Sequence, residues 1–112
     1  MSDNSLPLAP ATFLVLFALA GGDRHGYGIM QDVRKLDASF QLGPATLYTT
    51  IQRLLDNGLI SEVSGPESGE RRRRYYRITG EGSSALTMEL RRMESLVRKS
   101  KALRLQKAEA TS

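Results

Sequence analysis

The stretch from residue 41 to residue 79 constrains the fold of this 112-residue chain more than any other part. It reads QLGPATLYTTIQRLLDNGLISEVSGPESGERRRRYYRIT. An apolar periodicity typical of a helix is followed by a glycine stop and by two short strand-like segments, which a Gly- and Ser-containing turn separates. Five arginines and no acidic residue lie between Arg71 and Arg77. The stretch therefore predicts a helix followed directly by a basic two-stranded hairpin.

The helix in this stretch has the clearest boundaries. Pro44 suits a first helical position and Asn57-Gly58 suits a stop, whereas Gly43 offers no capping side chain. The helical period places one apolar set toward the core, consisting of Leu47, Ile51, Leu54 and Leu55. A small and polar set lies on the opposite face and its flanks: Ala45, Thr46, Tyr48, Thr49, Gln52 and Arg53. A face of this kind suits a helix that enters a groove of DNA.

The hairpin is predicted from residues 59–63, a turn at 64–69 and a return strand at 71–78. With a period of two, Tyr76 and Ile78 share the core face, and Arg73, Tyr75 and Arg77 share the other. A helix followed by a basic ribbon is typical of a winged helix-turn-helix, in which one element enters the major groove while the wing lies along the backbone or in the minor groove.

Three further helices are predicted around this unit. Residues 10–20 are apolar on nearly all sides, which predicts burial all round, and Gly21-Gly22 ends that helix. Residues 26–36 form a second helix, whose predicted core side carries Tyr27, Met30, Val33 and Leu36. Thr79 is a plausible N-cap for a last helix over residues 82–105. The expected fold is mainly α with a small β-hairpin (α+β): a winged helix-turn-helix at 1–79, a C-terminal dimerisation helix at 80–106 and a disordered tail at 107–112.

The composition excludes several classes of function. The chain has no cysteine and a single histidine, which leaves no disulfides, no thiolate zinc sites and no evident catalytic triad, so we expect no enzyme, metal or cofactor. The apolar stretch at residues 13–20 is too short to span a bilayer, and a cytoplasmic protein is expected. The net charge of +4 is modest, but the arginine cluster favours a polyanionic partner.

Several motifs together resemble the PadR family of transcriptional regulators. The motifs that carry the resemblance, which covers about residues 6–90, are HGYGI at 25–29, PATLY at 44–48, RL at 53–54, NGLI at 57–60, RRYYRIT at 73–79 and Gly82. The resemblance implies a winged-helix dimer that represses by binding operator DNA, often released by a small aromatic or drug-like effector. A single C-terminal helix is similar to the shorter branch of that family.

Each candidate DNA contact also has a structural interpretation. Arg71, Arg72, Arg73, Arg74 and Arg77 are interpreted as phosphate ligands, or else as charges that protect a strand edge. Tyr48 is interpreted as a phosphate donor or as a half-buried flank residue, and Tyr75 is grouped with the wing. The outward face of the helix at 44–56 either contacts bases or is plain exposed surface. We interpret the segment around His25 as a turn that starts a helix, not as a ligand site.

The last helix is the strongest indication of a second subunit. Its apolar stripe is longer than a small winged domain can cover, which predicts dimerisation, the alternative being packing along its own domain. The predicted interface consists of Phe13, Phe17, Leu86, Leu90, Met93, Leu96, Val97 and Leu103. The sequence thus favours a homodimeric transcriptional regulator that binds specific sequences of double-stranded DNA, and it favours a repressor over an activator. The alternative is a winged-helix interaction module that binds an acidic protein.

Overall fold

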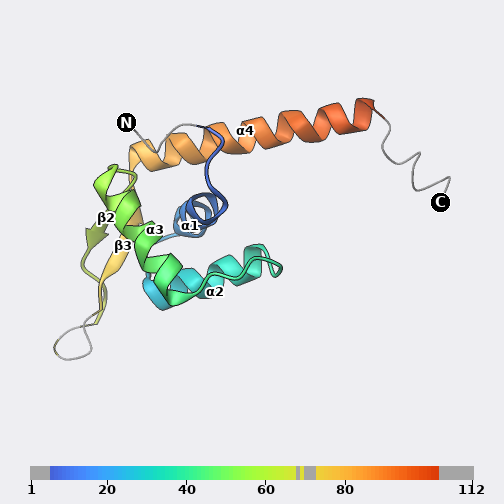
Figure 1. Ribbon diagram of the computed structural model, residues 1–112. Helices are drawn as coiled ribbons and strands as arrows, with labels where there is room; N and C mark the ends of the chain where they lie inside the picture. Colours follow the sequence, from blue (N-terminus) through green and yellow to red (C-terminus); the bar gives the residue numbers. More distant parts are fainter. Residues whose placement is uncertain (1–5, 68, 70–72, 104–112) are drawn as a thin grey trace.

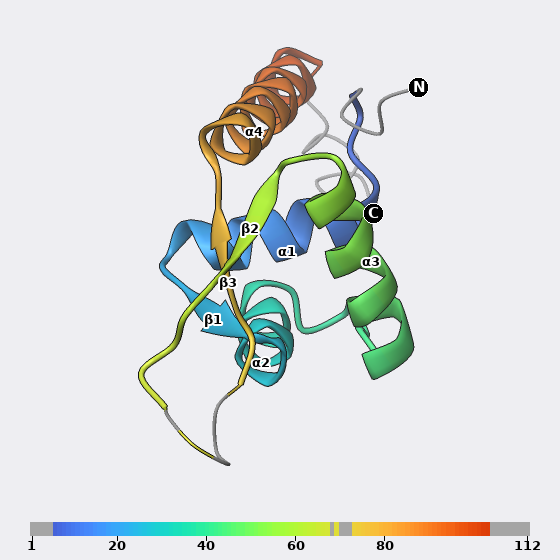
Figure 2. The ribbon, with the colours of Figure 1, turned by 90° about the vertical axis from the view of Figure 1, so that its left-hand side faces the viewer.

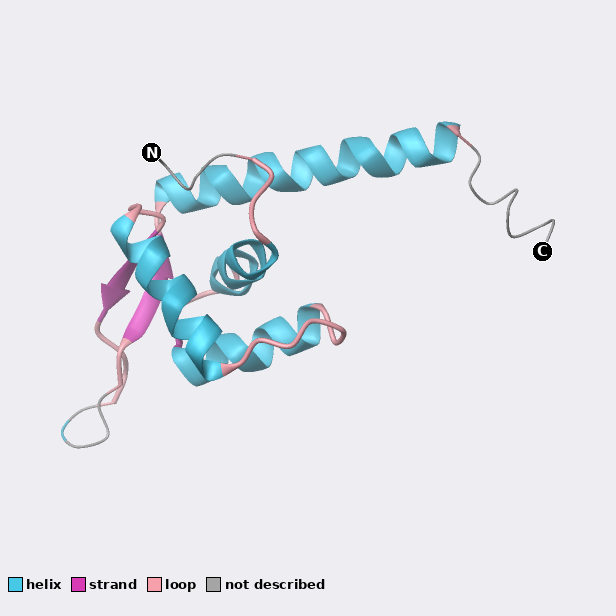
Figure 3. Cartoon of the chain, viewed as in Figure 1, coloured by secondary structure: helices cyan, strands magenta, loops and turns pink. Residues whose placement is uncertain are grey.

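The structure is a computed structural model that describes residues 6–67, 69 and 73–103. Figure 1 shows the elements in sequence colours, and Figure 3 shows that helices dominate the described chain. They are α1 (Pro10–Ala20), β1 (Arg24–His25), α2 (Gly26–Leu36), α3 (Pro44–Asp56), β2 (Ile60–Val63), β3 (Tyr75–Ile78) and α4 (Gly80–Ala102). The predicted mainly helical fold with a small sheet is confirmed, and the first three helices have the predicted bounds.

The sheet differs from the prediction because it has three strands among the described residues, in the order β1-β3-β2, with antiparallel pairs. Only the β2–β3 hairpin was predicted. β1 is two residues long, too short to show a periodicity, and it exists because Arg24 lies opposite Tyr76 and His25 opposite Tyr75. This register holds the start of α2 against the hairpin.

The return strand is also shorter than the predicted span of 71–78. β3 begins at Tyr75, and Arg73 and Arg74 precede it outside any strand. Arg71 and Arg72 lie outside the described residues. The predicted alternation holds along β3, since Tyr76 is buried in the core whereas Arg77 is exposed.

Helix α1 lies at the centre of the fold, between α4 and α2 in Figure 1, and it also packs against α3 and β3. Its buried side chains are Leu14, Val15, Leu16, Ala18 and Leu19. The prediction that this helix is buried on all sides is wrong, because the side chain of Phe17 is 36% exposed. Phe17 makes an edge-to-face contact with Phe13, with ring centroids 5.7 Å apart.

The core face of α2 is rotated from the predicted one. Tyr27 and Leu36, both expected inside, are 60% and 42% exposed. The buried positions are instead Gly26, Gly28, Ile29 and Val33, with Met30 partly buried. The two glycines let the first turn approach neighbouring side chains, so Tyr27 takes the outward position. The packing of the first turn, and not the apolar repeat, therefore sets the phase of this helix.

The junction between the sheet and α4 is fixed by Thr79, which is the N-cap as predicted. Its Oγ1 accepts the amide of Gly82 at 3.1 Å and donates to the carbonyl of Gly58 at 2.7 Å. Gly58 has a φ of +73°, a left-handed conformation that suits glycine at the end of α3. The helix starts two residues earlier than predicted and ends at Ala102, short of the predicted residue 105.

Only the first part of α4 packs on the domain. Gly82, Ala85, Leu86 and Glu89 are buried, and the helix then projects beyond the other elements, as Figure 1 shows. Leu86, which was assigned to a dimer interface, therefore belongs to the core of its own chain. The rest of the stripe is partly or largely exposed: Leu90, Met93, Leu96, Val97 and Leu103. The predicted tail at 107–112 lies outside the described residues.

Glu89 is a buried charge that the sequence did not indicate. Its side chain is 1% exposed and accepts from Arg92 Nε at 2.6 Å and from the backbone amide of Leu8 at 3.0 Å. The hydrogen bond from Arg92 is the largest cause that lowers the pKa of this carboxyl below its ordinary value of 4.5. Glu89 thereby ties the segment before α1 to α4.

We expect Glu89→Gln to lower the free energy of unfolding by about 1–2 kcal/mol at pH 7. A carboxylate whose pKa is lower in the folded state than in the unfolded state stabilises the fold at pH values above the unfolded-state pKa. That contribution is lost as the pH falls through the folded-state pKa. The difference between wild type and variant should therefore shrink below about pH 4.5. Urea unfolding at pH 7 and pH 3 measures this, and an equal difference at both pH values would contradict the assignment.

Candidate nucleic-acid interface

Helix α3 and the β2–β3 hairpin lie on one side of the domain, the side facing the viewer in Figure 2. The inward face of α3 buries Leu47, Thr50, Ile51 and Leu54, of which only Thr50 was not foreseen. All six α3 residues predicted to contact DNA are exposed: Ala45, Thr46, Tyr48, Thr49, Gln52 and Arg53. The helix thus presents a small, polar surface outward, beside the hairpin.

The C-terminal half of that surface carries an internal hydrogen bond. The side-chain amide of Gln52 donates to Asp56 Oδ1 at 2.9 Å, one helical turn away. A base contact that uses the amide nitrogen of Gln52 as a donor has to replace the bond to Asp56. The amide oxygen of Gln52 takes no part in that bond. Thr49 and Ala45 present small side chains one and two turns before Gln52, which leaves room for close approach to a base pair.

The arginines of the hairpin differ in their surroundings. Arg74 is largely exposed, and its Nε lies 4.0 Å from the Glu62 carboxylate. Arg73 is also exposed, with Nη1 2.8 Å from Nε2 of His25. Arg77 is held by two hydrogen bonds to the carboxylate of Asp23, at 2.8 and 3.1 Å. Its charge is therefore compensated within the chain, which the sequence pattern did not indicate.

The pairing of Arg77 with Asp23 is visible in the pKa of both groups. The hydrogen bond from Arg77 lowers the pKa of Asp23 below its ordinary value, and the carboxylate raises the pKa of Arg77. Both groups therefore stay charged and paired near neutral pH. The pair joins β3 to the turn before β1.

Tyr75 supports the base of the hairpin turn. Its hydroxyl donates to Glu67 Oε2 at 2.6 Å, and its ring lies where a side chain at Gly65 would have to go. The hydrogen bond from Tyr75 lowers the pKa of Glu67, and the charge of Arg73 acts in the same direction with a smaller effect. The hydroxyl of Tyr75, which had been grouped with the DNA contacts, is thus used within the wing.

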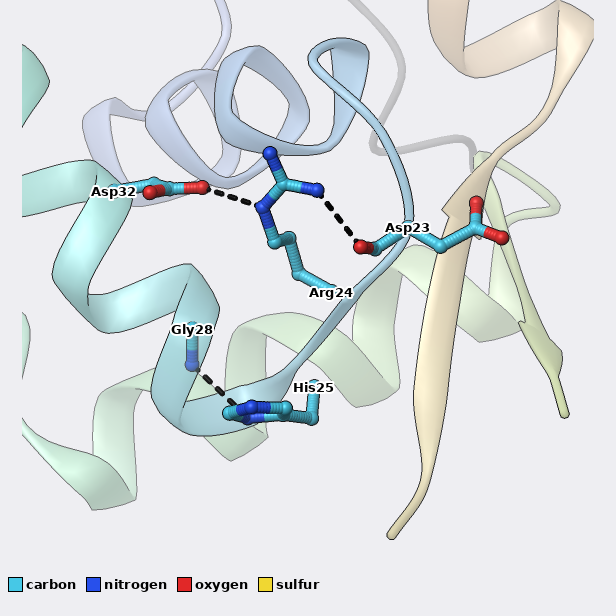
Figure 4. Close-up of polar contacts among 5 residues, drawn as sticks. All are labelled: Asp23, Arg24, His25, Gly28 and Asp32. Atoms are coloured by element: carbon cyan, nitrogen blue, oxygen red, sulfur yellow. Dashed lines mark hydrogen bonds and ion pairs between the residues drawn. The ribbon is translucent and has the colours of Figure 1, made fainter. Parts of the chain in front are cut away.

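Figure 4 shows how the short β1 segment positions its side chains. Arg24 donates from Nε to Asp32 at 2.8 Å and from Nη1 to the carbonyl of Asp23 at 2.8 Å. His25 caps α2, since its Nδ1 accepts the amide of Gly28 at 3.1 Å. The helix start predicted at His25 is correct, but the capping role of its ring was not foreseen. Asparagine, serine or aspartate is the usual signal for a cap, and histidine is not.

A hollow of about 520 Å³ lies between α3, the start of α2 and the hairpin. Its lining residues are His25, Gly26, Tyr27, Tyr48, Arg73, Arg74 and Tyr76. Gly26 makes room for Tyr48, because a Cβ at Gly26 would lie 2.6 Å from the Tyr48 hydroxyl. The hollow thus combines two arginines with exposed tyrosines, a set of donors that suits an anionic oxygen.

The exposed polar helix, the basic hairpin and the sheet that joins them define a winged helix-turn-helix domain. The sequence model of the PadR-like family of transcriptional regulators matches residues 15–88. The chain belongs to this family, and the resemblance predicted from its motifs is confirmed.

Individual relatives agree with this assignment. A transcriptional regulator of Mycobacterium tuberculosis is 34% identical over 84 residues, which cover 75% of this chain and 76% of the relative. A PadR family transcription regulator of Clostridium difficile has a structure similar to this one, with a TM-score of 0.73, 25% identity, and coverage of 85% of this chain and 98% of that one. Bacillus subtilis PadR, solved in complex with operator DNA, shares the fold with a TM-score of 0.66 and 21% identity, over 75% of this chain and 48% of that one.

No helix among the described residues combines the length and the apolar character that crossing a bilayer requires.

Proposed function

We propose that this chain is a sequence-specific repressor that binds operator DNA as a homodimer. The observation that carries the proposal is the exposed polar face of α3 beside a hairpin with exposed arginines. The operator complex of Bacillus subtilis PadR, which has the same fold, supports DNA as the ligand of this face. A protein-interaction module would be expected to expose apolar side chains on α3, where this chain exposes Thr49, Gln52 and Arg53.

Within this proposal the two elements have different tasks. Helix α3 enters the major groove, where Ala45, Thr49 and Gln52 contact base edges while Thr46, Tyr48 and Arg53 lie toward the backbone. The wing contributes phosphate contacts through Arg73 and Arg74, and Arg71 and Arg72 join them as predictions from sequence alone. Tyr75 and Arg77 support the wing from within, because their polar groups are bonded to Glu67 and Asp23.

The homodimer is proposed from the projecting part of α4. Leu96 and Val97 are 51% and 53% exposed there, and neither belongs to the core of the chain. A second copy would cover them together with Leu90, Met93 and Leu103, and Phe13 and Phe17 border the same region in the proposal. Two copies related by a twofold axis present two α3 helices, so the operator is expected to be an inverted repeat.

A small aromatic or drug-like effector that releases the repressor is the remaining element of the proposal. A hollow of about 310 Å³ combines apolar side chains, among them Phe13, Phe40 and Met93, with the charged side chains of Asp37, Glu89 and Arg92, a composition that suits a small aromatic ligand with polar groups. It lies where α4 meets the segment before α1, and a ligand there could shift α4 relative to α3.

Selection of bound fragments from random double-stranded DNA tests the function directly. We expect an enriched inverted repeat whose preference changes at one or two positions in Thr49→Ala or Gln52→Ala, with about 1–3 kcal/mol of discrimination lost at each. If no sequence is enriched and a polyacidic peptide binds instead, the repressor proposal fails and the interaction module replaces it.

The wing arginines allow a paired test of phosphate binding. Arg74→Ala should weaken binding to all DNA sequences and reduce the slope of log affinity against log salt by about one. Arg77→Ala removes the same charge, but Asp23 already compensates it, so the slope should change less. Titration of duplex DNA at several salt concentrations compares the two variants. Equal slopes in wild type and Arg74→Ala would contradict the phosphate assignment.

A further inference from the structure

The ring of His25 is fixed on the wall of the hollow between α3 and the wing. Pairing of His25 with Tyr75 between β1 and β3 fixes the position of its backbone. Its Nδ1 accepts a hydrogen bond from the amide of Gly28 at 3.1 Å. The Tyr75 ring meets it edge to face, with centroids 5.3 Å apart and planes at 89°. The second ring nitrogen, Nε2, is thereby directed at Arg73, whose Nη1 lies 2.8 Å away.

The hydrogen bonding of this pair is incomplete. A neutral imidazole has one nitrogen that accepts and one that carries hydrogen. Because Nδ1 of His25 accepts from Gly28, the hydrogen resides on Nε2. The guanidinium of Arg73 has donors and no acceptor, so two N–H groups face each other at 2.8 Å. An anionic oxygen placed beside both groups would accept from each and resolve the conflict.

The surroundings indicate which anion fits. Arg74 lines the same hollow, as do Tyr27 and Tyr48, both exposed. The hollow opens between the helix proposed to enter the major groove and the wing, where the DNA backbone would pass. We propose, resting on the DNA binding proposed above, that His25 and Arg73 together hold one phosphate of the DNA backbone in each half-site.

Two carboxylates oppose an anion at this place: Glu62, which lies 4.0 Å from Nε of Arg74, and Glu67. The carboxylate of Glu67 is near enough for Arg73 to lower its pKa, although it accepts from Tyr75. Its Oε1 is buried without a hydrogen-bond partner among the described residues. Glu67→Gln keeps an acceptor for Tyr75 and removes the charge, so it should tighten binding to duplex DNA by roughly threefold, since a like charge near the phosphate is lost.

The variant His25→Asn separates capping from phosphate binding. Asparagine is a strong N-cap, so α2 keeps its cap, but its shorter side chain has no donor in the place of Nε2. The affinity for duplex DNA should fall about tenfold, as expected for a lost hydrogen bond to a charged group. The fall should be the same for all base sequences, because a phosphate carries no sequence information.

Neutralising single phosphates of the selected duplex as methylphosphonates locates the contact. At one phosphate in each half-site, wild type should lose more affinity than His25→Asn, and at all other phosphates the two losses should be equal. Equal losses at every phosphate would overturn the assignment of His25. If wild type binds no duplex at all, the proposed function fails instead, so the two failures are distinguishable.

A second measurement does not depend on the variant. His25 is the only histidine of the chain, so the imidazole nitrogens give a single NMR spin system. We expect hydrogen on Nε2 in the protein alone, and a shifted, slowly exchanging Nε2 proton after duplex DNA is added. A ring protonated on Nδ1, or an Nε2 signal that duplex DNA leaves unchanged while binding occurs, would overturn the proposal.

Discussion

Leu96→Glu is expected to convert the proposed dimer to a folded monomer and to lower its affinity for the operator by about 100-fold or more. Leu96 lies in α4 beyond Glu89, the last buried residue of that helix, and its side chain is 51% exposed. A charge there cannot be buried against a second subunit without a partner. Since the second half-site is bound as an intramolecular step in the dimer, losing the dimer removes the whole gain of that step.

Ser84→Glu is the matched control for this prediction. It adds the same charge to the same helix, but the helical period places residue 84 on the side of α4 opposite to the apolar stripe, and Ser84 is exposed. The control should stay dimeric and bind the operator as wild type does. Sedimentation and operator titration compare the three proteins. A wild type that sediments as a monomer, or a Leu96→Glu variant that binds like the control, would contradict the dimer.

The proposed dimer also predicts the spacing of the operator. In a twofold arrangement two α3 helices meet successive major grooves on one side of the duplex, roughly 34–36 Å apart. The half-site centres of the selected repeat should therefore be about 10 base pairs apart or a multiple of that. Leu96→Glu should protect a single half-site in a footprint, because each monomer keeps only one reading helix.

The elements that the sequence predicts well are those with local signals. Helix α3 has a proline at its start, an Asn-Gly pair after its end and an apolar arc between them, so its bounds and its outward face follow from short-range rules. Thr79 is likewise identified as a cap from its place before a helical repeat. These signals need no knowledge of the remaining fold.

The features that the sequence does not indicate depend on distant partners. β1 exists only because β3 pairs with it some fifty residues later, and the capping ring of His25 faces Arg73 through that pairing. Glutamate is a residue type usually found at the surface, yet Glu89 is buried, because the amide of Leu8 donates to it across a separation of 81 residues. Tyr27 is exposed because the neighbouring glycines set the phase of α2. In each case a tertiary contact overrides the local pattern.

The second large effect is expected at Gly82, in the first turn of α4. A Cβ at this position would overlap the carbonyl oxygen of Leu59 and lie 2.9 Å from Cγ1 of Ile78. The carbonyl cannot move away easily, because it accepts the amide of Thr79 at 3.0 Å. Gly82→Ala should therefore force α4 off the sheet and lower the free energy of unfolding by about 3 kcal/mol, the upper range for overpacking.

Gly80→Ala is the control that isolates the steric cause. Gly80 lies in the same turn, and a Cβ there would meet nothing within 4 Å. Alanine favours helix, so this variant should be neutral or more stable by up to about 1 kcal/mol. In thermal unfolding, the midpoint temperature of Gly82→Ala should be lower than that of wild type by roughly 10–20 °C, and that of Gly80→Ala should be unchanged or higher. Gly82 also fixes the direction in which α4 leaves the domain. A destabilised but folded Gly82→Ala variant should therefore lose more affinity for the inverted repeat than for a duplex with a single half-site. If both alanine variants unfold at the same temperature, close packing at Gly82 does not determine where α4 sits.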